Sequence, residues 1–327
     1  MLKDYQIISI VGNTKNAGKT TVMNEYLSHF DRSNLAITSI GLDGEELDQV
    51  TNLEKPQILV RPGYLVATAY DTLEKFTCDF EIIKTLDIAT SIGNVVIIKI
   101  NSIGKALVAG PAKVKDMAIL ISELKNYQLE KIIIDGAFSR HVFAKITQAT
   151  ILVVGANYSR DIDVVVNDAV ILYKKFSLKY HNLKDFCFGD KICLINNDDI
   201  VTNLEYSSLI GNVDSFFNLD FENISKVYFP KSLTNKFVER LILERRRCKF
   251  DIIVDSPINI QVHHNLLKKL FQLENQLYVI NPLNVSLVCY NPVSPLGYEF
   301  DNEDFKNKLS TSLGREVFNV LEGERDE

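Results

Sequence analysis

The stretch from residue 5 to residue 21 constrains the fold of this chain more than any other. An apolar, β-rich run from Ile7 to Val11 leads into a small polar loop, which ends in Gly18-Lys19-Thr20-Thr21 and enters an amphipathic run at 22–30. Strand, loop, Gly-Lys-Thr and helix in this order are typical of a phosphate-binding loop. Such a loop wraps phosphates in successive backbone N–H groups, and the start of the helix adds the positive end of its dipole.

The residue types in this loop suggest separate roles. Lys19 is expected to neutralise the β- and γ-phosphates of a nucleotide, and the Thr20 hydroxyl is expected to ligate Mg²⁺. The usual spacing requires a glycine at position 13, where the chain has Asn13, and Gly12 lies one place too early. Asn is the non-glycine residue that best tolerates a positive φ, so a tight turn remains compatible with it. The predicted nucleotide-binding residues are Asn13, Thr14, Lys15, Asn16, Ala17, Gly18, Lys19, Thr20 and Thr21.

Two carboxylates are candidates for the catalytic and metal site. Lys131-Ile-Ile-Ile-Asp135 predicts a buried strand that carries a carboxylate at its C-terminal end, as a Walker B strand does. Because ligands of open α/β sheets bind at the carboxyl ends of the strands, Asp135 is expected to face Thr20 across a shared Mg²⁺. Asp43 follows a predicted strand at 35–41 and would position water or a third metal ligand. The alternative is that both aspartates only form Asp-Gly turns. The catalytic candidates are Lys19, Asp43 and Asp135, and the metal-ligand candidates are Thr20, Asp135 and Asp43.

The order of these elements indicates an α/β fold of the P-loop NTPase class with a mainly parallel sheet. Short apolar runs between residues 57 and 110 resemble an antiparallel β insertion between core strands. We therefore expect a P-loop NTPase domain at 1–200, with the β-rich insertion at about 57–110, and a C-terminal α/β region at 201–327.

Composition restricts the class of protein further. The chain has 46% hydrophobic and 24% charged residues, as ordinary globular proteins do, and no apolar run approaches the length of a membrane span. Its net charge of −6 argues against a nucleic-acid partner. The N-terminus has no signal-peptide pattern, and the five scattered cysteines contain no Cys-x-x-Cys pair. A cytoplasmic location without membrane contact is the natural expectation.

Two polar clusters have two interpretations each. The run Asn196-Asn-Asp-Asp199 follows a predicted strand, but its second residue is Asn197 where a guanine-reading Asn-Lys-x-Asp motif has lysine. An acidic turn and a preference for ATP are therefore favoured. The arginines at 240 and 245–247 could stabilise phosphate charge or bind a partner, or they could satisfy the C-terminal end of a helix.

Five segments, spread in order over nearly the whole chain, carry a resemblance to a known family. They are Thr14-Lys-Asn-Ala-Gly-Lys-Thr-Thr21, Gly41-Leu-Asp-Gly-Glu45, Leu65-Val-Ala-Thr-Ala69, Ile134-Asp-Gly-Ala137 and Asn291-Pro-Val-Ser-Pro-Leu-Gly-Tyr-Glu-Phe-Asp301. With these the chain resembles the P-loop subunits of reactivating factors for lysine 5,6-aminomutase, an adenosylcobalamin enzyme of lysine fermentation. The resemblance implies a chaperone that works with a second, MutS-like ATPase subunit. ATP hydrolysis would drive release of damaged cobalamin from an inactivated aminomutase. The chain lacks the cobalamin-ligating Asp-x-His-x-x-Gly motif, so it is not expected to hold that cofactor itself.

Three other functions remain compatible with the same loop. A small-molecule kinase or an ATP-dependent ligase of the dethiobiotin synthetase type would need cationic groups near an acceptor, for which Lys15 and Arg140 are candidates. A GTP-dependent metallochaperone would prefer GTP to ATP. A scaffold that binds nucleotide without hydrolysis would be consistent with Asn13 in place of glycine.

Overall fold

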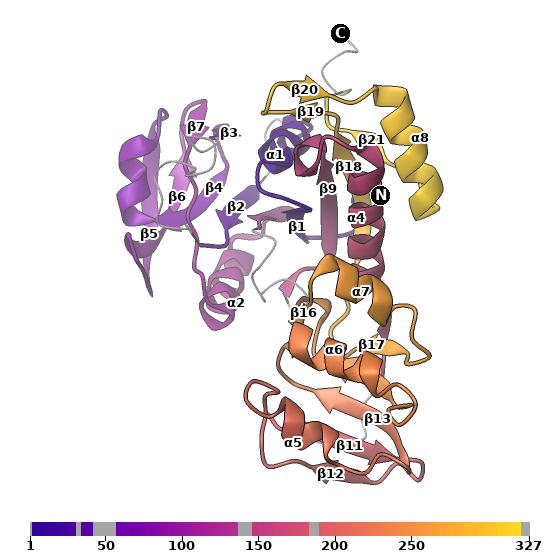
Figure 1. Cartoon of the computed structure of the whole chain (residues 1–327). Coiled ribbons are helices and arrows are strands. Elements are labelled where there is room, and N and C mark those ends of the chain that lie inside the picture. The colour runs from indigo at the N-terminus through magenta and orange to yellow at the C-terminus, as the bar shows by residue number, and fades with distance from the viewer. Residues whose placement is uncertain (1, 31–33, 42–56, 137–145, 183–189, 322–327) are drawn as a thin grey trace. The chain divides into compact units, whose positions relative to one another are not determined.

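The computed structural model describes residues 2–30, 34–41, 57–136, 146–182 and 190–321 (Figure 1). The chain divides into two compact units, one made of residues 1–169 and 285–327 and the other of residues 170–284. These limits differ from the predicted boundary at residue 200. The C-terminal residues belong to unit 1 because strand β18 (Val285–Asn291) pairs with strand β9 (Ala149–Gly155) in its sheet.

Unit 1 contains a nine-stranded sheet in the order β21-β18-β9-β1-β8-β2-β4-β6-β5. Every neighbouring pair from β21 to β4 is parallel, and β6 and β5 extend the sheet in antiparallel fashion. The predicted α/β fold with a mainly parallel sheet is therefore confirmed. The remaining strands are β1 (Ile7–Gly12), β2 (Leu35–Ser39), β4 (Leu65–Ala69), β5 (Phe80–Thr90), β6 (Gly93–Ile100), β8 (Lys131–Asp135) and β21 (Phe318–Asn319).

The segment at 57–110 is only in part a separate antiparallel element. Strands β3 (Ile58–Val60) and β7 (Gly104–Ala106) form an antiparallel pair of their own. Strand β4, however, joins the main sheet parallel to β2, and β6 and β5 continue the sheet from there. The predicted insertion thus lengthens the central sheet, because β4 is buried along its whole length and pairs on both sides.

The central strands of unit 1 are buried on both faces. All six residues of β1 and all seven of β9 are buried, which explains why these segments are continuous apolar runs. Helices α1 (Lys19–Ser28), α2 (Val114–Leu124) and α8 (Asn302–Leu313) lie in the connections between strands of unit 1, and α4 (Ile162–Phe176) follows β9 and crosses the unit boundary at residue 169. From β1 the chain crosses to β2 on one side, whereas β9, β18 and β21 follow on the other side. Such a reversal of strand order at β1 is where open α/β sheets bind ligands, at the carboxyl ends of the strands.

Unit 2 has its own six-stranded sheet in the order β10-β17-β15-β13-β11-β12. Its strands are β10 (Lys179–Tyr180), β11 (Cys193–Asn196), β12 (Val201–Asn203), β13 (Ile224–Phe229), β15 (Asp251–Val254) and β17 (Leu277–Val279), with helices α5 (Val213–Phe217), α6 (Asn235–Leu243) and α7 (His264–Leu270). Phe216 lies at the centre of a cluster of phenylalanine rings in its core. None of the helices in the described ranges of either unit has the length and apolar character needed to cross a membrane.

Candidate phosphate-binding site

The loop between β1 and α1 folds tightly against the carboxyl end of the sheet. A Cβ on Gly12 would stand 3.0 Å from the Ala17 Cβ and 3.2 Å from the Lys19 Cγ, so a larger residue there would force these side chains to shift. Gly18, the residue before α1, has a φ of 100°, which glycine adopts without strain. The turn at Gly18 is followed directly by the first N–H groups of α1, which, as in any helix, have no hydrogen-bond partners within the helix.

Asn13 occupies the position where the usual motif has glycine. The positive φ that we expected there falls instead on Asn16, at 59°. The Asn13 side chain is 7% exposed, and its Oδ1 accepts a 3.0 Å hydrogen bond from the backbone N–H of Gly155. Asn13 therefore links the ends of β1 and β9. Its Nδ2 is buried and has no hydrogen-bond acceptor among the described residues, which is an arrangement that a bound acceptor would relieve.

Lys19 and Asp135 supply the charges of the site. Lys19 begins α1, and its Nζ lies 3.4 Å from the Thr14 carbonyl oxygen. Burial lowers the pKa of the Lys19 ammonium, and the nearby negative charge of Asp135 acts in the opposite direction. Asp135 ends β8 in register with Ile10 of β1, so its carboxylate stands at the same edge of the sheet. The structure thus brings a partly desolvated cation and a carboxylate to the carboxyl end of β1.

The other predicted residues are placed as follows. Thr20 and Thr21 are half-buried in the first turn of α1, and Ala17 is fully buried. Lys15 is exposed, and its carbonyl oxygen accepts a hydrogen bond from Asn157 Nδ2 at 2.5 Å. Asp43 and Arg140 lie outside the described residues.

Sequence analysis did not place Asn291 in this site. Its Nδ2 would be 2.8 Å from a Cβ on Gly18, so its carboxamide lies against the turn that precedes α1. The Asn291 Oδ1 accepts a hydrogen bond from the Val293 N–H at 3.0 Å, which fixes the orientation of the amide. The sequence did single out the Asn-Pro turn at this position. The contact with Gly18 nevertheless depends on the pairing of Asn291 with Gly155 across β18 and β9.

A short hairpin follows Asn291 and is tied to the end of β9. It consists of β19 (Val293–Ser294) and β20 (Tyr298–Glu299). Tyr298 donates its hydroxyl hydrogen to the Ala156 carbonyl oxygen at 2.8 Å, and the Arg160 guanidinium lies 5.4 Å from the centre of the Tyr298 ring. The hairpin and α1 both appear at the top of unit 1 in Figure 1.

The Asn196 to Asp199 run belongs to unit 2, where it follows β11. The Asn196 Oδ1 accepts hydrogen bonds from the backbone N–H groups of Asp198 and Ile200, at 3.0 and 2.8 Å. This is the turn chemistry that we favoured from the sequence. The run is not part of the sheet that contains β1 and the loop after it.

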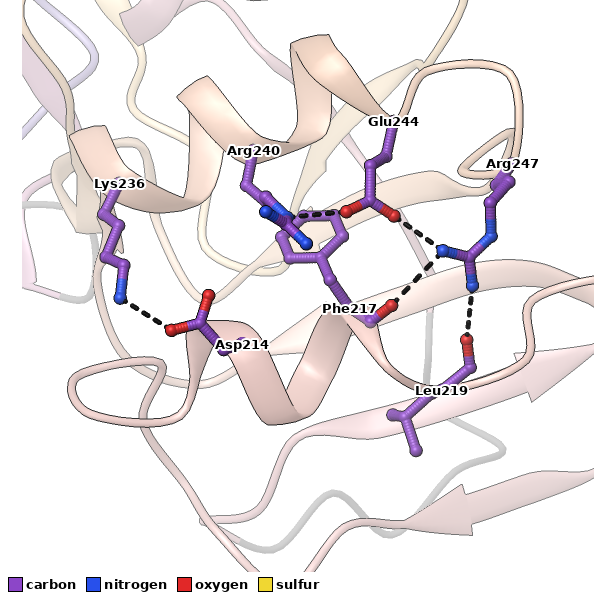
Figure 2. Close-up of polar contacts among 7 residues, drawn as sticks. All are labelled: Asp214, Phe217, Leu219, Lys236, Arg240, Glu244 and Arg247. Atoms are coloured by element: carbon purple, nitrogen blue, oxygen red, sulfur yellow. Dashed lines mark hydrogen bonds and ion pairs between the residues drawn. The ribbon is translucent and has the colours of Figure 1, made fainter.

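The arginines after α6 have structural partners within unit 2 (Figure 2). Glu244 accepts from Arg240 Nε at 2.6 Å and from Arg247 Nη1 at 2.7 Å. Arg247 also donates to the carbonyl oxygens of Phe217 and Leu219, at 3.4 and 3.1 Å. These contacts support the interpretation that the cluster stabilises the end of the helix and the connection after α5.

Within the described ranges, no group of three or more His, Cys, Asp or Glu side chains is placed to hold a metal ion. A magnesium ion at Thr20 and Asp135 would take its other oxygens from phosphate and water, as is usual for this ion. Comparison of the chain with protein-family models, with curated proteins and with solved structures gives no match.

Proposed function

We propose that the chain is a P-loop ATPase that binds ATP and Mg²⁺ at the loop between β1 and α1. The observation that carries the proposal is the partly desolvated Lys19 ammonium at the start of α1, with the Asp135 carboxylate at the same sheet edge. Removing an ammonium group from water is unfavourable, and the phosphates of a nucleotide would supply the compensating charge. The buried Asn13 Nδ2, which has no acceptor in the described part of the chain, is a second sign that an acceptor belongs here.

The residues present fit both groups. Lys19 and the first N–H groups of α1 would hold the phosphates, and the Thr20 hydroxyl and Asp135 carboxylate are the hard oxygen ligands that Mg²⁺ prefers. The bound ion would neutralise charge on the phosphates during hydrolysis. We assign to Asp43 the orientation of the attacking water.

We further propose, on the sequence resemblance, that the ATPase is one subunit of a cytoplasmic reactivating chaperone. With a MutS-like partner subunit it would restore an inactivated adenosylcobalamin-dependent aminomutase of lysine fermentation. Hydrolysis by the chain alone would be slow and would be stimulated by the partner. The contact of Asn291 with Gly18 supports such coupling, because it links the loop to the hairpin, whose Leu296 is 58% exposed.

The test compares ATP and GTP hydrolysis by the wild type and Lys19→Ala, alone and with the MutS-like subunit and inactivated aminomutase. Lys115→Ala, at an exposed lysine of α2, is the matched control. We expect Lys19→Ala to weaken ATP binding about 10- to 150-fold and to abolish both stimulated turnover and recovery of mutase activity.

Two results would replace the proposal. Tight nucleotide binding without hydrolysis in any mixture would make the chain a scaffold. Fast turnover that needs a small-molecule acceptor and no protein partner would make it a kinase or ligase.

A further inference from the structure

We propose that the base of the nucleotide is adenine and that it lies at the ends of β9 and β18, where the Asn291 carboxamide contacts it. The inference rests on the proposed function, since it assumes that phosphates occupy the loop at 12–20. It assigns a binding role to a residue outside that loop and explains a preference for ATP.

The direction of the nucleotide follows from the strand order. Strands β8 and β9 flank β1 on opposite sides. The β8 side ends in Asp135, whose carboxylate is suited to hold a metal ion that would in turn bind the terminal phosphate. The rest of the nucleotide must therefore extend toward β9 and β18, which end in Gly155 and Asn291, paired in register.

The Asn291 side chain has the hydrogen-bonding groups that adenine requires. In the described part of the chain its Nδ2 has no hydrogen-bond acceptor, and its Oδ1 accepts only from the Val293 N–H. A carboxamide oxygen has two lone pairs, so one remains for a second donor. Nδ2 can then donate to a ring nitrogen of adenine while Oδ1 accepts from N6–H, the bidentate pattern by which asparagine recognises this base.

Guanine would need the Asn291 amide in the opposite orientation, because it presents the acceptor O6 where adenine presents the donor N6–H. Its N1–H and N2–H groups are both donors on one edge, which a carboxylate accepts together. The described orientation of the Asn291 amide, which the Val293 N–H fixes, therefore favours adenine.

A planar surface is anchored directly after the end of β9, the strand that pairs with β18. The Arg160 guanidinium lies over the Tyr298 ring, and the Tyr298 hydroxyl is anchored to Ala156, directly after the end of β9. Guanidinium groups and aromatic rings are the surfaces on which bases stack. Arg160 is exposed, so its outer face is open to a ligand.

The test measures binding of ATP, GTP and tripolyphosphate, each with Mg²⁺, by isothermal titration calorimetry. Tripolyphosphate reports the phosphate site alone, because it lacks ribose and base. Asn291→Ala should weaken ATP binding about 5- to 150-fold and leave tripolyphosphate binding within about twofold. The control is Asn307→Ala, at an exposed asparagine of α8, which should change neither. Arg160→Ala, a surface change that does not endanger folding, should also weaken ATP binding and spare tripolyphosphate.

The outcomes separate the two proposals. Equal loss of ATP and tripolyphosphate binding in Asn291→Ala would overturn the inference, because Asn291 would then only support Gly18. Unchanged ATP binding in both variants, or equal affinity of the wild type for ATP and GTP, would overturn it as well. If Lys19→Ala leaves tripolyphosphate binding unchanged, or the wild type binds none, the proposed function itself fails and the inference fails with it.

Discussion

Replacement of Gly18 by alanine should destabilise unit 1 for two separable reasons. The first is backbone strain, since an alanine with a φ near 100° costs about 1–2 kcal/mol. Alanine also lowers the conformational entropy of the unfolded chain, which offsets about 0.4–1 kcal/mol of that cost. The second is overlap, because the new Cβ would stand 2.8 Å from Asn291 Nδ2 and 3.2 Å from Asn291 Cβ. Overpacking of this kind typically costs about 1–3 kcal/mol, so the net cost of the three terms is about 1–5 kcal/mol.

Gly63 provides a matched control for the strain alone. Its φ is 94°, and an added Cβ would meet no atom within 4 Å. Gly63→Ala should therefore cost only about 1 kcal/mol. The difference between the two variants measures the overlap with Asn291.

The assay is urea-induced unfolding followed by far-UV circular dichroism, with hydrogen exchange of the β1 amides to assign the transition to unit 1. Gly18→Ala should be repeated in an Asn291→Ala background, which removes the 2.8 Å contact and keeps the 3.2 Å contact. There its cost should fall by about 1 kcal/mol. Equal costs at Gly18 and Gly63, or no change in the Asn291→Ala background, would refute the described contact between the end of β18 and the loop.

Two further predictions concern unit 2. Burial lowers the pKa of Lys175, whose Nζ donates to a backbone carbonyl, to about 8. Between pH 8 and the unfolded-state pKa of 10.5, the unfolded state binds more protons than the folded state. The free energy of unfolding should therefore rise with pH, by at most about 1.4 kcal/mol per pH unit. Urea titrations from about pH 7.5 to 9.5 should show this slope in the wild type, and Lys175→Met should remove it. Arg247→Ala should lower the free energy of unfolding by about 1–2 kcal/mol, because it removes two hydrogen bonds to backbone carbonyls and an ion pair. The control, Arg246→Ala at the exposed neighbouring residue, should change the free energy of unfolding by no more than about 0.5 kcal/mol. Equal effects of the two arginine variants in thermal unfolding would contradict the network in Figure 2.

Local sequence signals predicted most elements of the central sheet. Strands β1, β8 and β9 are continuous apolar runs with turn residues at their ends, and such runs form buried strands in almost any parallel sheet. Helix α8 has its signals at both ends, with the Asp301 side chain accepting from the Asp304 N–H and Gly314 at a φ of 64°. Strand β13 was missed, because its first half contains the polar residues Ser225 and Lys226 and is only half-buried.

The candidate site divides in the same way. The sequence by itself determined the loop, the start of α1 and the strand that ends in Asp135, because each depends on residues adjacent in the chain. Asn13 was recognised as a departure from the usual motif, but its hydrogen bond to Gly155 was not predictable, since it joins residues that only sheet pairing brings together.

Only the tertiary structure decided which strands are neighbours. The apolar residues of a buried strand do not specify which strand it pairs with. The sequence therefore could not show that residues 170–284 form a separate unit and that β18 pairs with β9. That pairing places Asn291 against Gly18, far away in the chain. The loop is thus a property of local sequence, and the groups that surround it are a property of long-range packing.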